Sequence, residues 1–156
     1  MTYITDIPAV QDMAFCLGKE GCLFITLCSL AERIIKKPVD LIRTARACID
    51  EGLLDYVEEN PSSHLKEAFF VKDRDKLLSF ITGIDGITTI KTHHLQANEK
   101  RPYYIKYSRK LDDNKTATHF VLPDYNSLYY SFTVANGSID CYYIVVLPKK
   151  KNKKEE

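Results

Sequence analysis

The chain has 156 residues, of which 45% are apolar and 28% are charged, and its formal net charge is +1. This length accommodates one hydrophobic core but not two, because domains cluster near roughly 100 to 150 residues. Charges of both signs are mixed along most of the chain, so composition does not indicate binding to nucleic acid or anionic lipid. No stretch reaches the ~18 to 20 apolar residues of a membrane span, and the first ten residues do not read as a signal peptide. We therefore expect a cytoplasmic protein.

The sequence contains five cysteines, an odd number, and none of them forms a CxxC pair. Four lie in apolar, helix-like sequence, where cysteine behaves as a small packing group. Reduced and mostly buried thiols are therefore expected rather than a disulfide framework. The five positions are Cys16, Cys22, Cys28, Cys48 and Cys141.

Residues 22–35, with the sequence CLFITLCSLAERII, predict a central helix. This segment is apolar almost all round, which is typical of a helix enclosed by the rest of its domain. Lys36 and Lys37 suit the end of such a helix, and Pro38 cannot continue its hydrogen-bond ladder.

Two further helices are expected. Pro38 suits the first turn of a helix that continues to about Leu53, with Val39, Ile42, Ala45 and Ile49 on its packing face. After a short strand over residues 69–71, Asp73 can cap a third helix that ends at Gly83.

From residue 84 onward, alternating and β-branched residues separated by turn residues predict an antiparallel sheet. The fold class is therefore α+β, with a helical N-terminal half packed on this sheet. Residues 1–148 are expected to form a single domain, and the lysine-rich residues 149–156 a disordered tail. The predicted strands are 87–93, 103–108, 118–122, 128–134 and 141–147, the last of them central because it is continuously apolar.

Cys22 follows Gly21 at the start of the predicted central helix. A helix N-terminus stabilises a thiolate through its unpaired N–H groups and its dipole, so this is a suitable place for a nucleophilic cysteine. Such a cysteine needs a histidine as base and a third residue that orients the histidine. His119 opens the strand sequence HFVL, and Asn136 follows the next predicted strand.

These motifs resemble those of two groups of proteins. Gly21-Cys22 with its apolar helix, His119-Phe120-Val121-Leu122 and Val134-Ala135-Asn136 are similar to the papain-like fold, in the variant of small bacterial peptidases and transporter-linked leader peptidases. Over most of residues 12–147, the Gly-Cys helix, the segment FFVKDRDKLLSFITG and the HFVL strand also resemble an uncharacterised domain family of spirochaete plasmids and prophages. That second family implies no established activity.

The resemblance to papain-like peptidases implies Cys22 as nucleophile, His119 as general base and Asn136 as the orienting residue, with Asp124 and Asp140 as alternatives for the last role. It implies a peptide or amide substrate and no cofactor. The sequence departs from that family at one place, because Cys16 stands where a glutamine usually donates a hydrogen bond to the oxyanion. Loss of such a donor typically costs ~10² to 10³ in rate. Gln11 could replace it only with a different intervening loop.

Other interpretations stay open beside the hydrolase. Cys22 can be a packing group and His119 a half-buried histidine, which would make the protein a non-catalytic binding module of plasmid or prophage origin. Nucleic-acid binding through Arg43, Arg46 and the lysine tail is the weaker alternative, because acidic residues dilute that surface. The adjacent His93 and His94 would point to opposite faces of a strand, so no metal site is expected.

Overall fold

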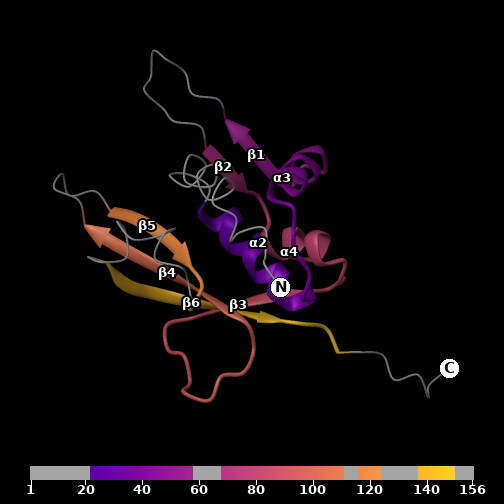
Figure 1. Ribbon diagram of the computed structural model, residues 1–156. Helices are drawn as coiled ribbons and strands as arrows, with labels where there is room; N and C mark the ends of the chain where they lie inside the picture. Colours follow the sequence, from indigo (N-terminus) through magenta and orange to yellow (C-terminus); the bar gives the residue numbers. More distant parts are fainter. Residues whose placement is uncertain (1–21, 58–67, 111–115, 124–136, 150–156) are drawn as a thin grey trace, which may run out of the picture.

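A computed structural model describes residues 22–57, 68–110, 116–123 and 137–149. Within these residues the protein is α+β, with three helices, a four-stranded antiparallel sheet and a separate two-stranded sheet (Figure 1). In chain order the elements are α2 (Cys22–Ile35), α3 (Leu41–Asp50), β1 (Leu54–Val57), β2 (Ala68–Val71), α4 (Arg74–Thr82), β3 (Thr88–Thr92), β4 (Tyr103–Lys110), β5 (Thr116–Val121) and β6 (Ser138–Val146).

The four-stranded sheet has the strand order β3-β6-β4-β5, and every neighbouring pair is antiparallel. The prediction that the apolar strand around residues 141–147 is central is confirmed, because β6 lies between β3 and β4. β5 is an edge strand of the sheet as described. The predicted strand 128–134 and all of the lysine-rich tail beyond Lys149 lie outside the described residues.

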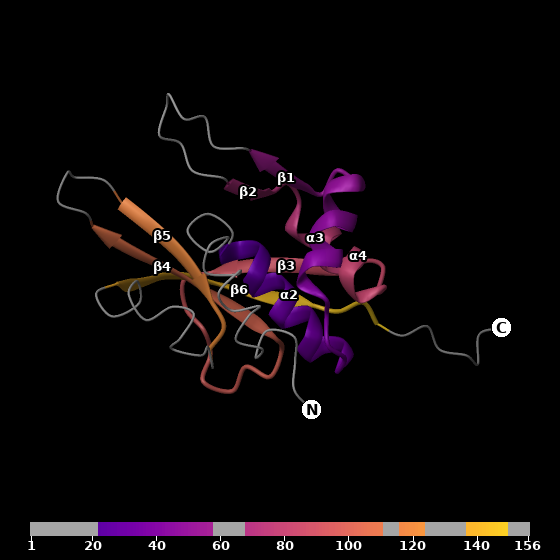
Figure 2. The same cartoon turned by 45° about the horizontal axis from the view of Figure 1, so that its top comes forward.

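α2 is the central helix that the sequence predicts, and it ends at Ile35 as expected. It passes between the four-stranded sheet and the β1–β2 pair (Figures 1 and 2). An all-round apolar sequence suits this position, because both sides of the helix are covered. Its side chains share one hydrophobic core with residues from one face of the sheet; the buried members include Phe24, Leu27, Cys28, Ala31, Tyr104, Leu122 and Val145.

The prediction for the second helix was wrong in its start and only partly right in its packing face, since Val39 and Ala45 pack in the core whereas Ile42 and Ile49 are exposed. The Asp40 carboxylate accepts hydrogen bonds from the N–H groups of Ile42 and Arg43, so Asp40 is the N-cap and Pro38 precedes the helix. Leu41 and Cys48 form the buried stripe together with the partly buried Ala45, whereas 56% of Ile42 is exposed. The helix also ends at Asp50, and the chain then enters β1, which the sequence reading missed.

The third helix agrees with its prediction at both ends. The Asp73 carboxylate accepts hydrogen bonds from the N–H groups of Asp75 and Lys76, and Gly83 closes α4 with a left-handed backbone at φ 72°. No helix among the described residues is both long enough and apolar enough to cross a membrane.

Candidate functional site

Cys22 differs from the other cysteines that the structure describes. Cys28, Cys48 and Cys141 are buried, whereas Cys22 is partly exposed at the first residue of α2. Burial raises the pKa of Cys28 well above its usual value and raises the pKa of Cys48 to about 11. Since a thiolate is the reactive form of cysteine, the raised pKa values of Cys28 and Cys48 disfavour reaction of these two thiols at neutral pH. Cys22 is thus the described cysteine placed to react with a solute.

His119 lies on β5 and is only 6% exposed. Burial lowers the pKa of its imidazole to about 4, because the charged form is poorly solvated there. The ring is therefore neutral at physiological pH. A neutral imidazole can accept a proton, but a conjugate acid with so low a pKa makes it a weak base.

One hydrogen bond joins the helix of Cys22 to the strand of His119. The hydroxyl of Thr26, one helical turn after Cys22, donates to the backbone carbonyl of Phe120 at 3.0 Å. Thr26 is fully buried at this contact. The first turns of α2 therefore lie beside the part of β5 that carries His119.

The side chain of His119, however, lies on the sheet face opposite to α2. The Phe120 ring belongs to the α2 face, because it packs against Tyr104 and Tyr143 in the core that α2 covers. Side chains alternate along a strand, so His119 shares the other face with Val121. The pairing of Val121 with Ile105, in a second buried cluster away from the α2 core, agrees with this assignment.

Of the three residues that could orient His119, the structure describes only Asp140. Asn136 and Asp124 lie outside the described residues, as do Cys16 and Gln11. Asp140 is described, at the start of β6, and its carboxylate lies 3.4 Å from the ammonium group of Lys106. β4 separates β6 from the strand of His119. The set Cys22, His119 and Asn136 therefore stays a prediction.

A cluster of aromatic rings around Arg74 was missed at the sequence level. The Arg74 guanidinium lies 4.4 Å from the centroid of the Tyr143 ring, and its Nη1 donates to the Tyr104 hydroxyl at 3.1 Å. Tyr104 and Tyr143 are stacked, with ring centroids 5.0 Å apart. The sequence shows many tyrosines in this half, but only the β4–β6 register places these two beside Arg74.

A pocket of about 270 Å³ lies at the far end of α2. It is formed by the last turns of α2, the segment before β4 and the residues that follow β5. Apolar side chains predominate, and three cationic residues also line it. The full lining is Leu30, Arg33, Ile34, Glu99, Lys100, Arg101, Pro102, Tyr103, Leu122 and Pro123.

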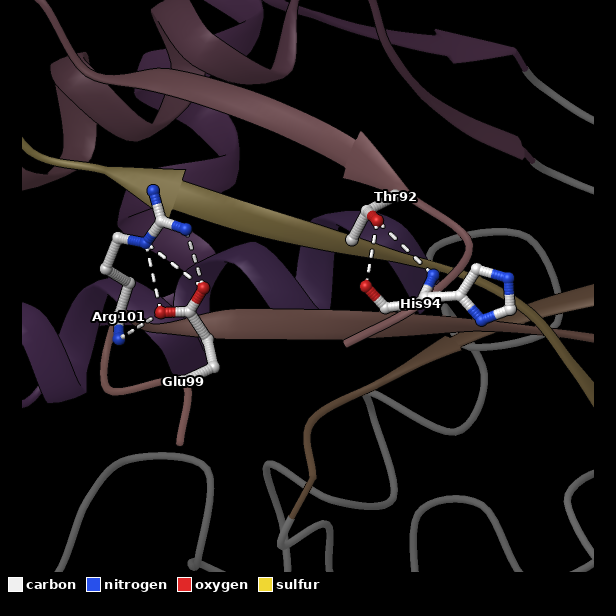
Figure 3. A network of polar contacts seen from close by, with 4 residues as sticks. All are labelled: Thr92, His94, Glu99 and Arg101. Atoms are coloured by element: carbon white, nitrogen blue, oxygen red, sulfur yellow. Dashed lines mark hydrogen bonds and ion pairs between the residues drawn. The ribbon is translucent and has the colours of Figure 1, made fainter. Parts of the chain in front are cut away.

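Residues 99–102, which line this pocket, are held by polar contacts. Figure 3 shows those between Glu99 and Arg101, together with those between Thr92 and His94. The Arg101 side chain donates to both carboxylate oxygens of Glu99, the shortest contact being 2.6 Å from Nη2 to Oε1. These hydrogen bonds lower the pKa of Glu99 to about 2, so the pair is ionised at physiological pH. The N–H of Val145 also donates to the carbonyl of Pro102 at 2.8 Å, which ties the segment to β6.

Within the described residues, no group of three or more His, Cys, Asp or Glu side chains is placed to hold a metal ion. Comparison of the chain with protein-family models, with curated proteins and with solved structures gave no match.

Proposed function

We propose that this chain is a binding protein with a papain-like fold in which the cysteine and the histidine no longer act as a catalytic pair. The fold is supported by a central helix that starts at Cys22 and packs on an antiparallel sheet. The single observation that carries the loss of catalysis is the alternation along β5. It directs His119 away from the sheet face on which α2 packs.

The state of His119 supports the same proposal. A general base works best with a pKa near the operating pH, whereas burial lowers the pKa of His119 to about 4. A thiolate–imidazolium pair, the usual resting state of a papain-like site, would require a charged ring at a position that is 6% exposed. His119 is better suited to packing than to proton transfer.

A cysteine hydrolase is the second candidate, and the position of Cys22 favours it. Cys22 is partly exposed at the first residue of α2, and the Thr26–Phe120 hydrogen bond holds this part of α2 beside β5. In that mechanism His119 takes the thiol proton and the sulfur attacks the carbonyl of a peptide or amide. The protonated imidazole then gives its proton to the leaving amine, and water hydrolyses the thioester. Asn136 would orient His119.

Acyl transfer from p-nitrophenyl acetate separates the two candidates without a known substrate. Attack by the Cys22 thiolate would release p-nitrophenolate and leave an acetyl thioester that mass spectrometry locates. We expect Cys22 to be acetylated no faster than a simple thiol at a helix terminus. The rate of acetylation should be the same in His119→Gln, and neither protein should turn over the ester. Turnover that is lost in Cys22→Ser and falls by about 10² or more in His119→Gln, the usual size of a general-base contribution, would establish the hydrolase instead.

A further inference from the structure

β3 is an edge strand of the four-stranded sheet, and its outer side is open within the described part of the chain. It pairs with β6 alone, at one end of the order β3-β6-β4-β5. In an antiparallel sheet, alternate residues of an edge strand direct their N–H and C=O groups away from the neighbouring strand. No hydrogen bond from another described residue reaches these outer groups of β3. The edge can therefore accept a further strand.

α4 lies above the sheet near β3 and leaves this edge uncovered. The Thr89 hydroxyl on β3 donates to the Asp75 carboxylate in the first turn of α4. The Arg74 guanidinium, one residue earlier, lies over the Tyr143 ring of β6, which is further inside the sheet. Both contacts are made on the sheet face on which α2 packs. The start of α4 is therefore directed inward over β6, and the backbone edge of β3 stays accessible in the plane of the sheet.

The side chains of β3 are divided between the two faces of the sheet. Thr89 and Lys91 are on the α2 face, because they lie opposite core residues of β6 that face α2. Ile90 is on the other face and is 46% exposed, with Thr88 and Thr92 on either side of it. β-Branched residues such as threonine and isoleucine favour strand pairing. A second strand beside β3 would cover the exposed Ile90.

Two charges of opposite sign lie along this edge without an ion-pair partner. Within the described ranges, the Asp75 carboxylate has no cationic partner, and the exposed Lys91 has no anionic one. In its own chain Lys91 lies opposite Tyr143, whose ring carries the Arg74 guanidinium, so its surroundings there are cationic. Because Asp75 is bonded to Thr89, the anion and the cation are two positions apart along β3. The edge is therefore complementary in charge to an antiparallel copy of itself.

We infer that β3 pairs antiparallel with β3 of a second copy of this chain, about a two-fold axis centred on Ile90. The two Ile90 side chains then lie opposite each other, as do Thr88 of one copy and Thr92 of the other. Lys91 lies opposite Thr89 of the second copy and beside the Asp75 to which that Thr89 is bonded. Two-fold symmetry makes this ion pair twice. The inference goes beyond the proposed function and does not depend on it.

The charges favour this register over its neighbours. A shift that keeps each side chain on its own face moves the centre of the pair by one residue along both strands. Centring the pair on Lys91 would place two ammonium groups directly opposite each other, which is destabilising. Centring it on Thr89 would bring the two Asp75 carboxylates together and move Lys91 away from them. Only the pair centred on Ile90 brings opposite charges together at both ends.

The interface formed in this way is small. Two strands of five residues bury much less than the roughly 1,200 Å² at which stable complexes begin. The contacts are backbone hydrogen bonds, one apolar pair and two exposed ion pairs. We therefore expect a transient dimer, with a Kd on the order of 0.1 to 1 mM.

The test follows the full chain by two-dimensional NMR over a concentration series that brackets this Kd. The amide signals of residues 88–92 should shift with concentration, and translational diffusion should slow. Lys91→Glu turns both ion pairs into repulsions and should weaken association about tenfold or more, and Asp75→Lys should do the same. Lys100→Glu changes the net charge equally at an exposed site away from β3 and should leave the Kd within about twofold. Thermal melts verify that each variant is folded.

A mixture of the two weakened variants tests the second copy and the register together. In a mixed dimer, the new carboxylate at position 91 meets the new ammonium group at position 75 of the other chain. The original contact between Lys91 and Asp75 is kept at the other end. We expect the β3 signals of isotope-labelled Lys91→Glu to shift on addition of unlabelled Asp75→Lys, with an affinity close to that of the unchanged protein.

Three results of these measurements would overturn the inference. They are β3 signals that do not depend on concentration, equal effects of Lys91→Glu and Lys100→Glu, and a mixture that associates no better than its components. A Thr-Val repeat peptide that is acetylated and amidated at its ends gives a fourth. If it shifts the β3 signals of a protein that stays monomeric, the edge binds extended peptides and not a second copy. None of these measurements involves Cys22 or His119, so failure here leaves the proposed function to be judged by the acetyl-transfer experiment.

Discussion

At the scale of single residues, the burial of His119 gives the protein a pH-dependent stability. Its pKa is about 4 in the folded protein and near 6.5 in an unfolded chain. Between these values the unfolded chain binds the proton and the folded protein does not, so acid favours unfolding. The contribution of His119 is complete above pH 6.5 and is lost as the pH falls towards 4.

The expected size of this effect is on the order of 2 to 3 kcal/mol between pH 6.5 and 4, from about 1.4 kcal/mol per pKa unit. Urea unfolding at a series of pH values would measure it. His119→Gln should flatten the dependence in this range, while the same substitution at the exposed His94 should not. An unchanged slope in His119→Gln would show that other groups cause the acid sensitivity.

Arg74 and Tyr104 form a second interaction that can be tested at this scale. The Arg74 guanidinium donates to the hydroxyl of Tyr104, a fully buried residue. Removal of the guanidinium therefore leaves the Tyr104 hydroxyl without this donor. A double-mutant cycle with Arg74→Met and Tyr104→Phe should give a coupling of about 0.5 to 1.5 kcal/mol in urea unfolding. If the two substitutions are additive, the hydrogen bond contributes nothing to stability.

At the scale of helices and strands, caps and turns made some elements predictable from sequence. Asp73 and Gly83 act over a few residues, and the ends of α4 were predicted correctly from them. The start of α3 was predicted one turn too early because Pro38 and Asp40 both suit a helix N-terminus, and local chemistry alone does not rank them. The exposure of Ile42 follows from the orientation of α3 on the core, which turns Leu41 and Cys48 inward.

Gly83 provides a stability test for this scale. Its φ of 72° is in the left-handed region, and a Cβ there would meet no atom within 4 Å, so substitution costs conformational energy without a clash. Gly83→Ala should lower the free energy of unfolding by about 1 kcal/mol, and Gly83→Asn by less, because asparagine tolerates this conformation better. Thermal or urea unfolding would measure both, and equal losses would contradict the conformational explanation.

At the scale of the whole molecule, the sequence predicted the α+β class, the central helix and the interior position of the 141–147 strand. It could not predict the order β3-β6-β4-β5, because that order depends on pairings between residues far apart in the chain. The same limit applies to the candidate site. The sequence correctly placed Cys22 on a helix and His119 on a strand. The face to which His119 points, however, depends on the register of that strand, because a shift of one residue turns every side chain to the opposite face of the sheet.

The pocket beyond α2 was likewise not predictable. Its lining comes from residues 30–34, 99–103 and 122–123, which carry no shared motif and meet only in the fold. Glu99 and Arg101 are close in sequence, but a carboxylate and a guanidinium two residues apart occur in many exposed loops. Their ion pair is seen to border a largely apolar pocket only once the fold brings the end of α2 and the residues after β5 beside it.

The central claim, that Cys22 and His119 work independently, is tested most directly by the pH dependence of Cys22 alkylation. Iodoacetamide labelling followed at the Cys22 peptide by mass spectrometry gives the apparent pKa of this thiol in the unchanged protein and in His119→Gln, with circular dichroism verifying the fold of the variant. The account predicts the same apparent pKa in both proteins. An apparent pKa that rises by about one unit or more on removal of the imidazole, equivalent to about 1.4 kcal/mol of interaction, would contradict it and establish the catalytic pair.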